Sequence, residues 1–225
     1  MTAPTTPDLV GAQFELRAAI YATLSQAFLS EAEIAQRAAL GEVVSVCAEL
    51  ARLGDSAALE AAAARMRSRL AADWDEDALA RAYARVFLVG HGAVAPYQSV
   101  FDSLDGLAMQ AARDECLAFY ARFGLACGEG SAEPEDHVGI QLAFLAWLNR
   151  PSDTFSRREQ LRAQAEFIDR HLRAWVPRLA AAIADADPLG WYADLAGVLG
   201  EFLEVDRRHW VEALIEAEAS APLSS

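Results

Sequence analysis

Residues 133–137, with the sequence Glu-Pro-Glu-Asp-His, place three carboxylates and an imidazole directly before the apolar segment 138–148. Pro134 suits the first turn of a helix because it has no N–H group to lose there. Glu135 and Asp136 would then lie in that turn, where the helix dipole favours negative charge. A helix that is apolar on nearly every side belongs in the middle of a bundle. We therefore expect a buried helix whose polar mouth, at or near the surface, binds a ligand or a partner.

His137 allows two interpretations. It would share a helix face with Ile140 and Phe144, and a lone histidine on an apolar face is most simply a satisfied core residue. Neighbouring carboxylates would favour the charged form of its ring, whereas burial would favour the neutral form. The sequence does not decide between these two effects.

A metal site is the alternative use of these side chains. Glu133, Asp136 and His137, with His91 from a distant segment, could form a mixed ligand set, and the protein would then be a helical metal-dependent hydrolase. The chain has no HExxH motif and no paired histidines at ligand spacing. The sequence therefore favours a binding site without metal, and we expect no cofactor.

A second candidate region follows a loop at residues 90–96. Tyr97 and Phe101 lie beside Pro96 and could line a groove for a peptide, because aromatic rings bury a large area and a tyrosine adds a polar group. Packing in the core is the simpler alternative for such rings. Ser99 lies outside any G-x-S-x-G elbow, which argues against a nucleophilic serine.

The composition limits the kinds of partner. The chain has 225 residues, a formal net charge of −14 and 19 basic residues, all of them arginine. This balance argues against nucleic-acid binding and suits a basic partner, although the acids could serve solubility alone. Three cysteines without metal-ligand spacing fit free thiols in a reducing compartment. There is no secretory signal and no apolar run of the roughly 20 residues that span a membrane, so we expect a cytoplasmic protein.

The hydrophobic periodicity predicts an all-α protein with about 8–11 helices in one globular domain, residues 1–225. A plausible capping box, Ser30 to Glu33, opens the second helix, and Asp73 is the expected cap of the fourth. The predicted helices cover residues 9–29, 34–54, 56–72, 73–90, 104–123, 134–148, 154–174, 177–187 and 188–218. The glycine-rich segment 124–133 is a candidate hinge, and residues 1–8 and 219–225 are expected to be disordered.

Three of these segments together resemble the TorD/DmsD family of molybdoenzyme chaperones. The first helix carries the Arg/Tyr/Leu/Phe pattern of that family. The stretch from Tyr83 to Phe101 is similar to its "Y..LF.G … P..S.Y" block, with Phe101 in place of the common tyrosine. Residues 133–137 are similar to its E-P-x-D-H signature, followed here by Gln141 where an acid is often found. The resemblance covers roughly residues 10–205 in the same order.

The resemblance implies a helical protein of the TorD type, monomeric or domain-swapped into a dimer, without enzymatic activity. Its partners would be the twin-arginine signal peptide and the apo catalytic subunit of a molybdoenzyme, held in the cytoplasm until the cofactor is inserted. Glu133, Glu135 and Asp136 could meet the arginines of such a peptide. Tyr97, Phe101 and the loop before them could hold its apolar part. The expected client-binding site also includes Pro134, His137, Pro96 and Ser99. A third possibility is an assembly factor that recognises a folded surface.

Overall fold

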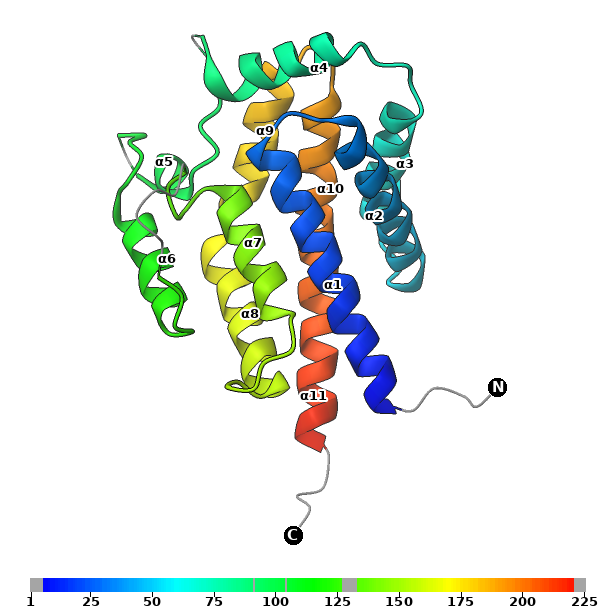
Figure 1. The fold of residues 1–225 in the computed structure, drawn as a ribbon, viewed down its shortest axis with the longest axis vertical. Helices are drawn as coiled ribbons and strands as arrows, with labels where there is room; N and C mark the ends of the chain where they lie inside the picture. Colours follow the sequence, from blue (N-terminus) through cyan, green and yellow to red (C-terminus); the bar gives the residue numbers. More distant parts are fainter. Residues whose placement is uncertain (1–5, 91, 104, 127–132, 221–225) are drawn as a thin grey trace.

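The computed structural model describes residues 6–90, 92–103, 105–126 and 133–220, and these form an all-α bundle (Figure 1). The prediction of an all-α fold with 8–11 helices is confirmed. The helices are α1 Thr6–Leu29, α2 Ile34–Leu53, α3 Ala57–Leu70, α4 Glu76–Tyr83, α5 Gln98–Asp102, α6 Ala111–Ala121, α7 Val138–Leu148, α8 Arg157–His171, α9 Val176–Ala186, α10 Trp191–Val205 and α11 Glu212–Ser220, with π-helical segments η1 Ala84–Leu88 and η2 Asp206–Val211.

The arrangement places α7 against α1 over nearly its whole length (Figure 1). The α2–α3 pair lies on one side of α1, the α7–α8 pair lies on the other, and α9 and α10 pack behind them. The short α5 and α6 form the outer edge beyond α7 and α8, and α4 crosses one end of the bundle. This layout brings the end of α1, the loop before α5 and the start of α7 to one region of the molecule.

The close contact between α1 and α7 depends on Gly139. A Cβ atom at this position would lie 2.5 Å from Cγ of Leu29, so a larger residue would require the Leu29 side chain or the helices to shift. The hydroxyl of Ser25 donates a hydrogen bond of 2.7 Å to the carbonyl oxygen of Gly139. Gly139, one of the two non-hydrophobic positions in this apolar segment, thus fixes how α7 packs.

A buried ion pair joins the first helix to the last third of the chain. Nη2 of Arg17 lies 2.9 Å from Oδ2 of Asp206, and the hydroxyl of Tyr21 donates to the same oxygen at 2.5 Å. Arg17 and Asp206 are 2% and 0% exposed. Arg17 and Tyr21 of the family-like pattern in the first helix therefore have a structural partner that sequence analysis did not identify.

Several predicted helix boundaries were wrong. No capping box forms at Ser30, because α2 begins after Glu33, whose side chain makes no capping bond. The cap of α4 is Asp75, which accepts a hydrogen bond from the N–H of Asp77, and not Asp73. The predicted helix 104–123 is shorter, since Gly106 and Met109 adopt positive φ and α6 begins only at Ala111.

The expectations for the chain ends and the hinge are tested only in part. Residues 6–8, expected to be disordered, belong to α1, and residues 219–220 belong to α11. Most of the candidate hinge 124–133 lies outside the described residues.

Candidate functional site

The acidic segment lies before α7 and not in its first turn. Pro134 starts a turn that closes with a hydrogen bond of 3.0 Å from the N–H of His137 to the carbonyl oxygen of Pro134. His137 is the N-cap, and α7 begins at Val138. The expectation that Pro134, Glu135 and Asp136 occupy the first helical turn was therefore wrong.

The two predicted regions meet in a short antiparallel pairing, which we call the clasp (residues 96–99 and 136–138). The N–H of Gln98 donates to the carbonyl of Asp136 at 3.0 Å, and the N–H of Val138 donates to the carbonyl of Pro96 at 2.9 Å. The clasp fixes the loop before α5 against the start of α7. The structure thus brings together candidates that lie about 40 residues apart.

Asp136 locks the clasp from inside. Its Oδ2 accepts a hydrogen bond of 2.8 Å from the N–H of Ser99, in the first turn of α5, and its side chain is completely buried. A carboxylate at this place satisfies a backbone donor that has no partner within the helix. The start of α7 was predicted too early because Asp136 accepts a hydrogen bond from α5 and not from the helix that follows it in the sequence.

His137 is a buried, neutral ring. Its Nδ1 accepts a hydrogen bond of 2.9 Å from the N–H of Gly139, so the ring carries its proton on Nε2. Burial lowers the pKa of His137 to about 4, against the opposing charges of Glu133 and Asp136. The ring of Tyr97 packs edge-on against it, with ring centroids 5.2 Å apart. The interpretation as a satisfied interior histidine agrees with this geometry.

Glu135 is held by an arginine of the same chain. Its carboxylate pairs with Nε and Nη2 of Arg113, at 2.5 and 3.3 Å, and its carbonyl accepts a hydrogen bond of 2.9 Å from the hydroxyl of Tyr120. This contact raises the pKa of the Arg113 guanidinium. Glu135 was expected to meet an arginine of a client peptide. In the structure it pairs with an arginine of α6.

Glu133 and Tyr97 form the outer part of the cluster. The hydroxyl of Tyr97 donates a hydrogen bond of 2.6 Å to Oε2 of Glu133, and both residues keep part of their surface exposed. Burial and the carboxylate of Glu133 raise the pKa of the Tyr97 hydroxyl. Pro134 is also partly exposed, whereas Glu135, Asp136 and His137 are buried. The accessible part of the predicted site is therefore smaller than expected.

Phe101 does not join this cluster. Helix α5 carries it to the α9 side, where its ring lies 5.5 Å from that of Trp175 and the guanidinium of Arg178 lies 6.0 Å above it. The structure therefore does not bring Tyr97 and Phe101 into one groove. Phe87, in the preceding segment, packs with Phe28 and Tyr192 in the core.

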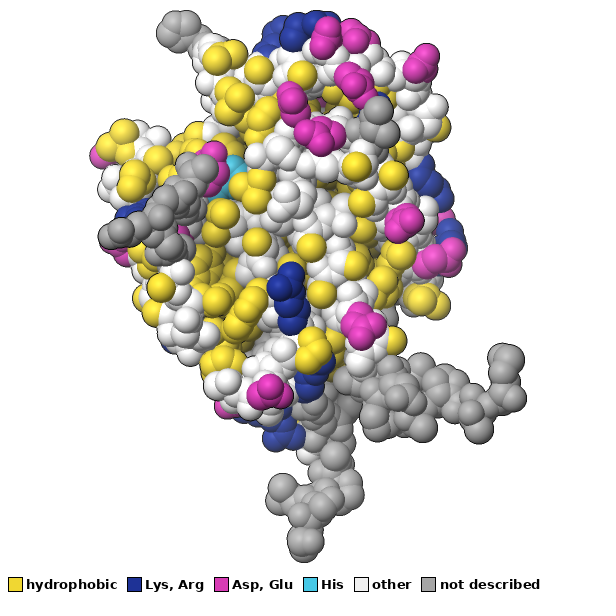
Figure 2. Space-filling view, viewed as in Figure 1, with side chains coloured by type: hydrophobic (Ala, Val, Ile, Leu, Met, Phe, Trp, Pro, Cys, Tyr) yellow, Lys and Arg dark blue, Asp and Glu magenta, His cyan; other side chains and the backbone are white. Residues whose placement is uncertain are grey.

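An acidic cleft that sequence analysis missed lies near Glu133. Four exposed acids from the α1–α2 connection and from α4 line a cavity of about 460 Å³: Glu31, Glu33, Glu76 and Asp77. Figure 2 shows acidic side chains gathered over this end of the molecule. Arg37 pairs with Glu76 at 3.3 Å. The acids come from segments some 40 residues apart, so only the fold reveals the cleft.

Tyr83 connects this cleft with the clasp. Burial and the charges of Glu133 and Glu31 raise the pKa of its hydroxyl, which places both carboxylates in its surroundings. The hydroxyl donates to the carbonyl of Phe28 at 3.4 Å. Glu133 beside the clasp and Glu31 of the cleft therefore both lie near Tyr83.

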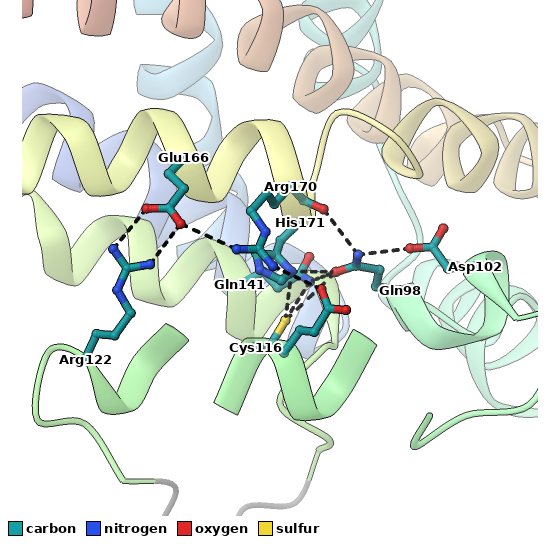
Figure 3. A network of polar contacts seen from close by, with 9 residues as sticks. Gln98, Asp102, Cys116, Arg122, Gln141, Glu166, Arg170 and His171 are labelled. Atoms are coloured by element: carbon teal, nitrogen blue, oxygen red, sulfur yellow. Dashed lines mark hydrogen bonds and ion pairs between the residues drawn. The ribbon is translucent and has the colours of Figure 1, made fainter. Parts of the chain in front are cut away.

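A buried polar network lies behind the clasp and joins four helices (Figure 3). Oε1 of Gln98 accepts a hydrogen bond of 2.8 Å from Nε2 of Gln141 and lies 3.2 Å from Nδ1 of His171. The thiol of Cys116 lies 3.5 Å from the same ring nitrogen. Gln141 therefore interrupts the apolar run of α7 because α5, α6 and α8 meet there.

His171 and Cys116, the ionisable side chains in the buried part of this network, are uncharged at neutral pH. Burial lowers the pKa of His171 to about 4, with a further decrease from Arg170. Burial raises the pKa of the Cys116 thiol to about 12, so the thiol is a poor nucleophile. Both groups act here as parts of the interior.

The geometry gives little support to a metal-dependent hydrolase. Nδ1 of His137 and Oδ2 of Asp136 are already engaged by backbone N–H groups. Among the described residues, no three His, Cys, Asp or Glu side chains are grouped so that they could hold a metal ion. His91 and Cys127 lie outside those residues.

No helix within the described part of the chain is both long enough and apolar enough to cross a membrane.

Comparison with known proteins identifies the family. A sequence model of the family "nitrate reductase delta subunit" matches residues 53–181, more than half of the chain. The chaperone protein TorD of Vibrio parahaemolyticus is 28% identical over 205 residues, which cover 85% of this chain and 93% of that protein. The TorD protein of Vibrio atlanticus is 30% identical over 53% of this chain, a match that spans only 57% of its length.

Two further relatives extend this comparison. The selenate reductase assembly chaperone protein of Thauera selenatis is 34% identical over 103 residues, covering 41% of this chain and half of that protein. A crystal structure of a protein from Archaeoglobus fulgidus, assigned as a redox enzyme maturation protein, superposes with a TM-score of 0.51 at 20% identity, over 91% of this chain and 97% of that one. The helical fold and the sequence matches agree, and the chain therefore belongs to the nitrate reductase delta subunit family, with TorD chaperones among its relatives.

Proposed function

We propose that the protein is a cytoplasmic, non-enzymatic chaperone for a molybdenum-containing oxidoreductase. It binds the twin-arginine signal peptide or the apo form of the catalytic subunit and assists maturation before export. Its relatives named as chaperones, one of them for selenate reductase assembly, support this role. The observation that carries the peptide-binding part is the cleft lined by the exposed acids Glu31, Glu33, Glu76 and Asp77, together with the partly exposed Glu133.

The chemistry of this surface matches a basic peptide. Arginine guanidiniums form paired hydrogen bonds with carboxylates, and an acidic field speeds the approach of a basic partner. Glu133 and the four acids of the cleft keep surface exposed for such contacts. Most of the affinity would still come from contacts that exclude water, and the charges would mainly set the register and the rate of encounter.

The buried members of the signature segment have a different role in this proposal. Asp136 and His137 position the loop that carries Tyr97, and Glu135 positions α6 through Arg113. Pro96 and Ser99 contribute backbone groups to the clasp. The client then contacts Glu133, Pro134 and Tyr97 at the outer edge.

A binding experiment tests the proposal. The probe is a synthetic peptide with two adjacent arginines followed by an apolar stretch, titrated calorimetrically at low and at moderate salt. We expect the double variant Glu31→Gln/Asp77→Gln to lower the affinity about threefold to tenfold, with most of the difference lost at moderate salt. Glu60→Gln is the matched control, since Glu60 is an exposed acid on α3, outside the cleft.

Two results would contradict the proposal. One is wild-type protein that does not bind the peptide. The other is a Glu31→Gln/Asp77→Gln protein that binds it as tightly and with the same salt dependence as wild type.

A further inference from the structure

Helix α7 presents an apolar surface that the fold leaves partly uncovered. Ile140, Ala143 and Trp147 recur at a spacing of three and four residues and so share one face of the helix. Ala143 is exposed, and the other two keep part of their surface in solvent. The remaining residues of α7 are buried against α1, α8 and the core.

Aromatic side chains from other segments extend this face into a wider surface. Phe123, just after α6, lies with its ring centroid 6.3 Å from that of Trp147 and 4.9 Å from that of Phe155. Leu125, two residues further along the chain, also packs against the core, and Phe123, Leu125 and Phe155 are all partly exposed. We call this surface the shelf and define it by the residues Phe123, Leu125, Ile140, Ala143, Trp147 and Phe155. Figure 2 shows hydrophobic side chains gathered beside α7 on this face.

The charges at the two ends of the shelf differ. The helix itself has no charged residue. Glu133, bonded to Tyr97, lies at its N-terminal end. Arg150 follows its C-terminal end, and a cavity of about 310 Å³ beside Phe123 and Phe155 is lined by both basic and acidic side chains: Arg122, Arg162, Glu159 and Glu166. Neither Arg150 nor Arg162 makes an ion pair within the part of the chain that the structure describes.

We propose that the shelf binds the apolar stretch of the client peptide, with the basic residues of the peptide at the Glu133 end. This proposal rests on the proposed function and assigns the part of the molecule that holds the apolar half of the peptide. A surface with an acid at one end and uncharged aromatic rings along its length complements a peptide that is basic, then apolar. Partly exposed aromatic rings are the groups that most often anchor such contacts.

The size of the shelf suits this occupant. The 11 residues of α7 span about 16 Å, which an apolar peptide of similar length covers as a helix. The contact would bury the aromatic rings that the fold leaves in solvent, and apolar surface of this kind on a soluble protein marks an interaction site.

Two synthetic peptides test the proposal on the full-length protein. The first has two adjacent arginines followed by about eleven alternating leucines and alanines, the length of α7 when helical. The second has glycine and serine in place of the leucines and alanines. Ala143→Arg and Ala143→Glu place a charge of either sign in the middle of the shelf at an exposed position. Ala64→Arg and Ala64→Glu, at an exposed position of α3, are the matched controls.

We expect wild type to bind the first peptide more tightly than the second. Both Ala143 variants should bind the first peptide at least about tenfold more weakly, because a buried charge opposes an apolar contact whatever its sign. Neither control should change the affinity. Thermal unfolding curves that match wild type would show that the variants keep their fold.

Three results would overturn the proposal. If both Ala143 variants bind the first peptide as wild type does, the shelf is not the contact, although the proposed function stands. If Ala143 variants only convert a dimer into a monomer and leave peptide affinity unchanged, the shelf is an interface between two copies. If wild type binds neither peptide, this proposal and the proposed function fail together.

Discussion

Charged groups inside this protein hold distant elements together, whereas charged groups at its rim line an open cleft. Arg17, Asp206 and Asp136 are buried and hold elements that are far apart in the sequence. Glu31, Glu76 and Asp77 are exposed around a cleft and make few contacts with the rest of the chain. Glu135 and Asp136, the acids next to His137 in the motif, are bonded within the chain and stabilise the site. The acids best placed to meet a partner come from segments without a recognisable motif.

The largest effect should follow from breaking the buried ion pair. We expect Arg17→Met to lower the free energy of unfolding by about 3–5 kcal/mol, because it leaves the carboxylate of Asp206 buried without its cation. Urea unfolding followed by circular dichroism measures this change. The double variant Arg17→Met/Asp206→Leu should recover part of the loss, since both charges are then removed. A single variant as stable as wild type would show that the pair does not stabilise the interior.

The two buried histidines should make the protein sensitive to acid. The pKa of each ring in the folded state is about 4, below that of a histidine in an unfolded chain, so the unfolded chain takes up protons first as the pH falls. The contribution of the neutral rings to the free energy of unfolding is fully present above about pH 6.5. It should fall by about 1.4 kcal/mol per pH unit for each ring down to pH 4. Urea midpoints between pH 7 and pH 4.5 measure this slope.

The variant His171→Phe tests how much of the acid sensitivity comes from His171. His171→Phe removes one of the two rings, and we expect it to reduce the slope of stability against pH by about half, even if it lowers stability overall. The same slope in His171→Phe and in wild type would contradict the buried, neutral state of His171. Chemical shifts of the two rings, followed by NMR, give an independent measure of each pKa.

The clasp should depend on the shape of Asp136 more than on its charge. Asp136→Ala leaves the N–H of Ser99 without its acceptor in a buried place, and we expect a loss of about 2 kcal/mol in the free energy of unfolding. Asp136→Asn keeps an oxygen in the same position and should cost clearly less. Equal losses in the two variants would show that the negative charge itself is required there.

Local sequence patterns predicted the parts of the fold that local physics determines. The spacing of Tyr21, Leu24 and Phe28 gave the first helix, and the glycines before Pro96 marked the loop that follows α4 and η1. The same reasoning failed where a residue serves a distant partner. Asp136 looked like part of a helix N-terminus because its acceptor role at Ser99, 37 residues earlier, leaves no local signal.

The candidate site shows the same division. The motif predicted that Tyr97 lies beside the 133–137 segment, and the clasp pairs them; their role in binding a client stays a prediction. It could not place Phe101, because the direction of α5 depends on its packing against Trp175. Nor could it show Arg113 as the partner of Glu135, since the pair forms only when α6 folds back on the loop before α7.

The smallest expected effects are on peptide affinity, and they compare the buried acid Asp136 with the partly exposed acid Glu133. Asp136→Asn should bind the arginine-containing peptide within about twofold of wild type, because the carboxylate is completely buried and accepts a hydrogen bond from the N–H of Ser99. Glu133→Gln removes a partly exposed charge but keeps an acceptor for the hydroxyl of Tyr97, and we expect about threefold to fivefold weaker binding at low salt. Calorimetric titration of both variants measures the difference. A larger loss in Asp136→Asn than in Glu133→Gln, with unfolding curves like that of wild type, would reverse the comparison, because the peptide would then reach an acid that this fold encloses.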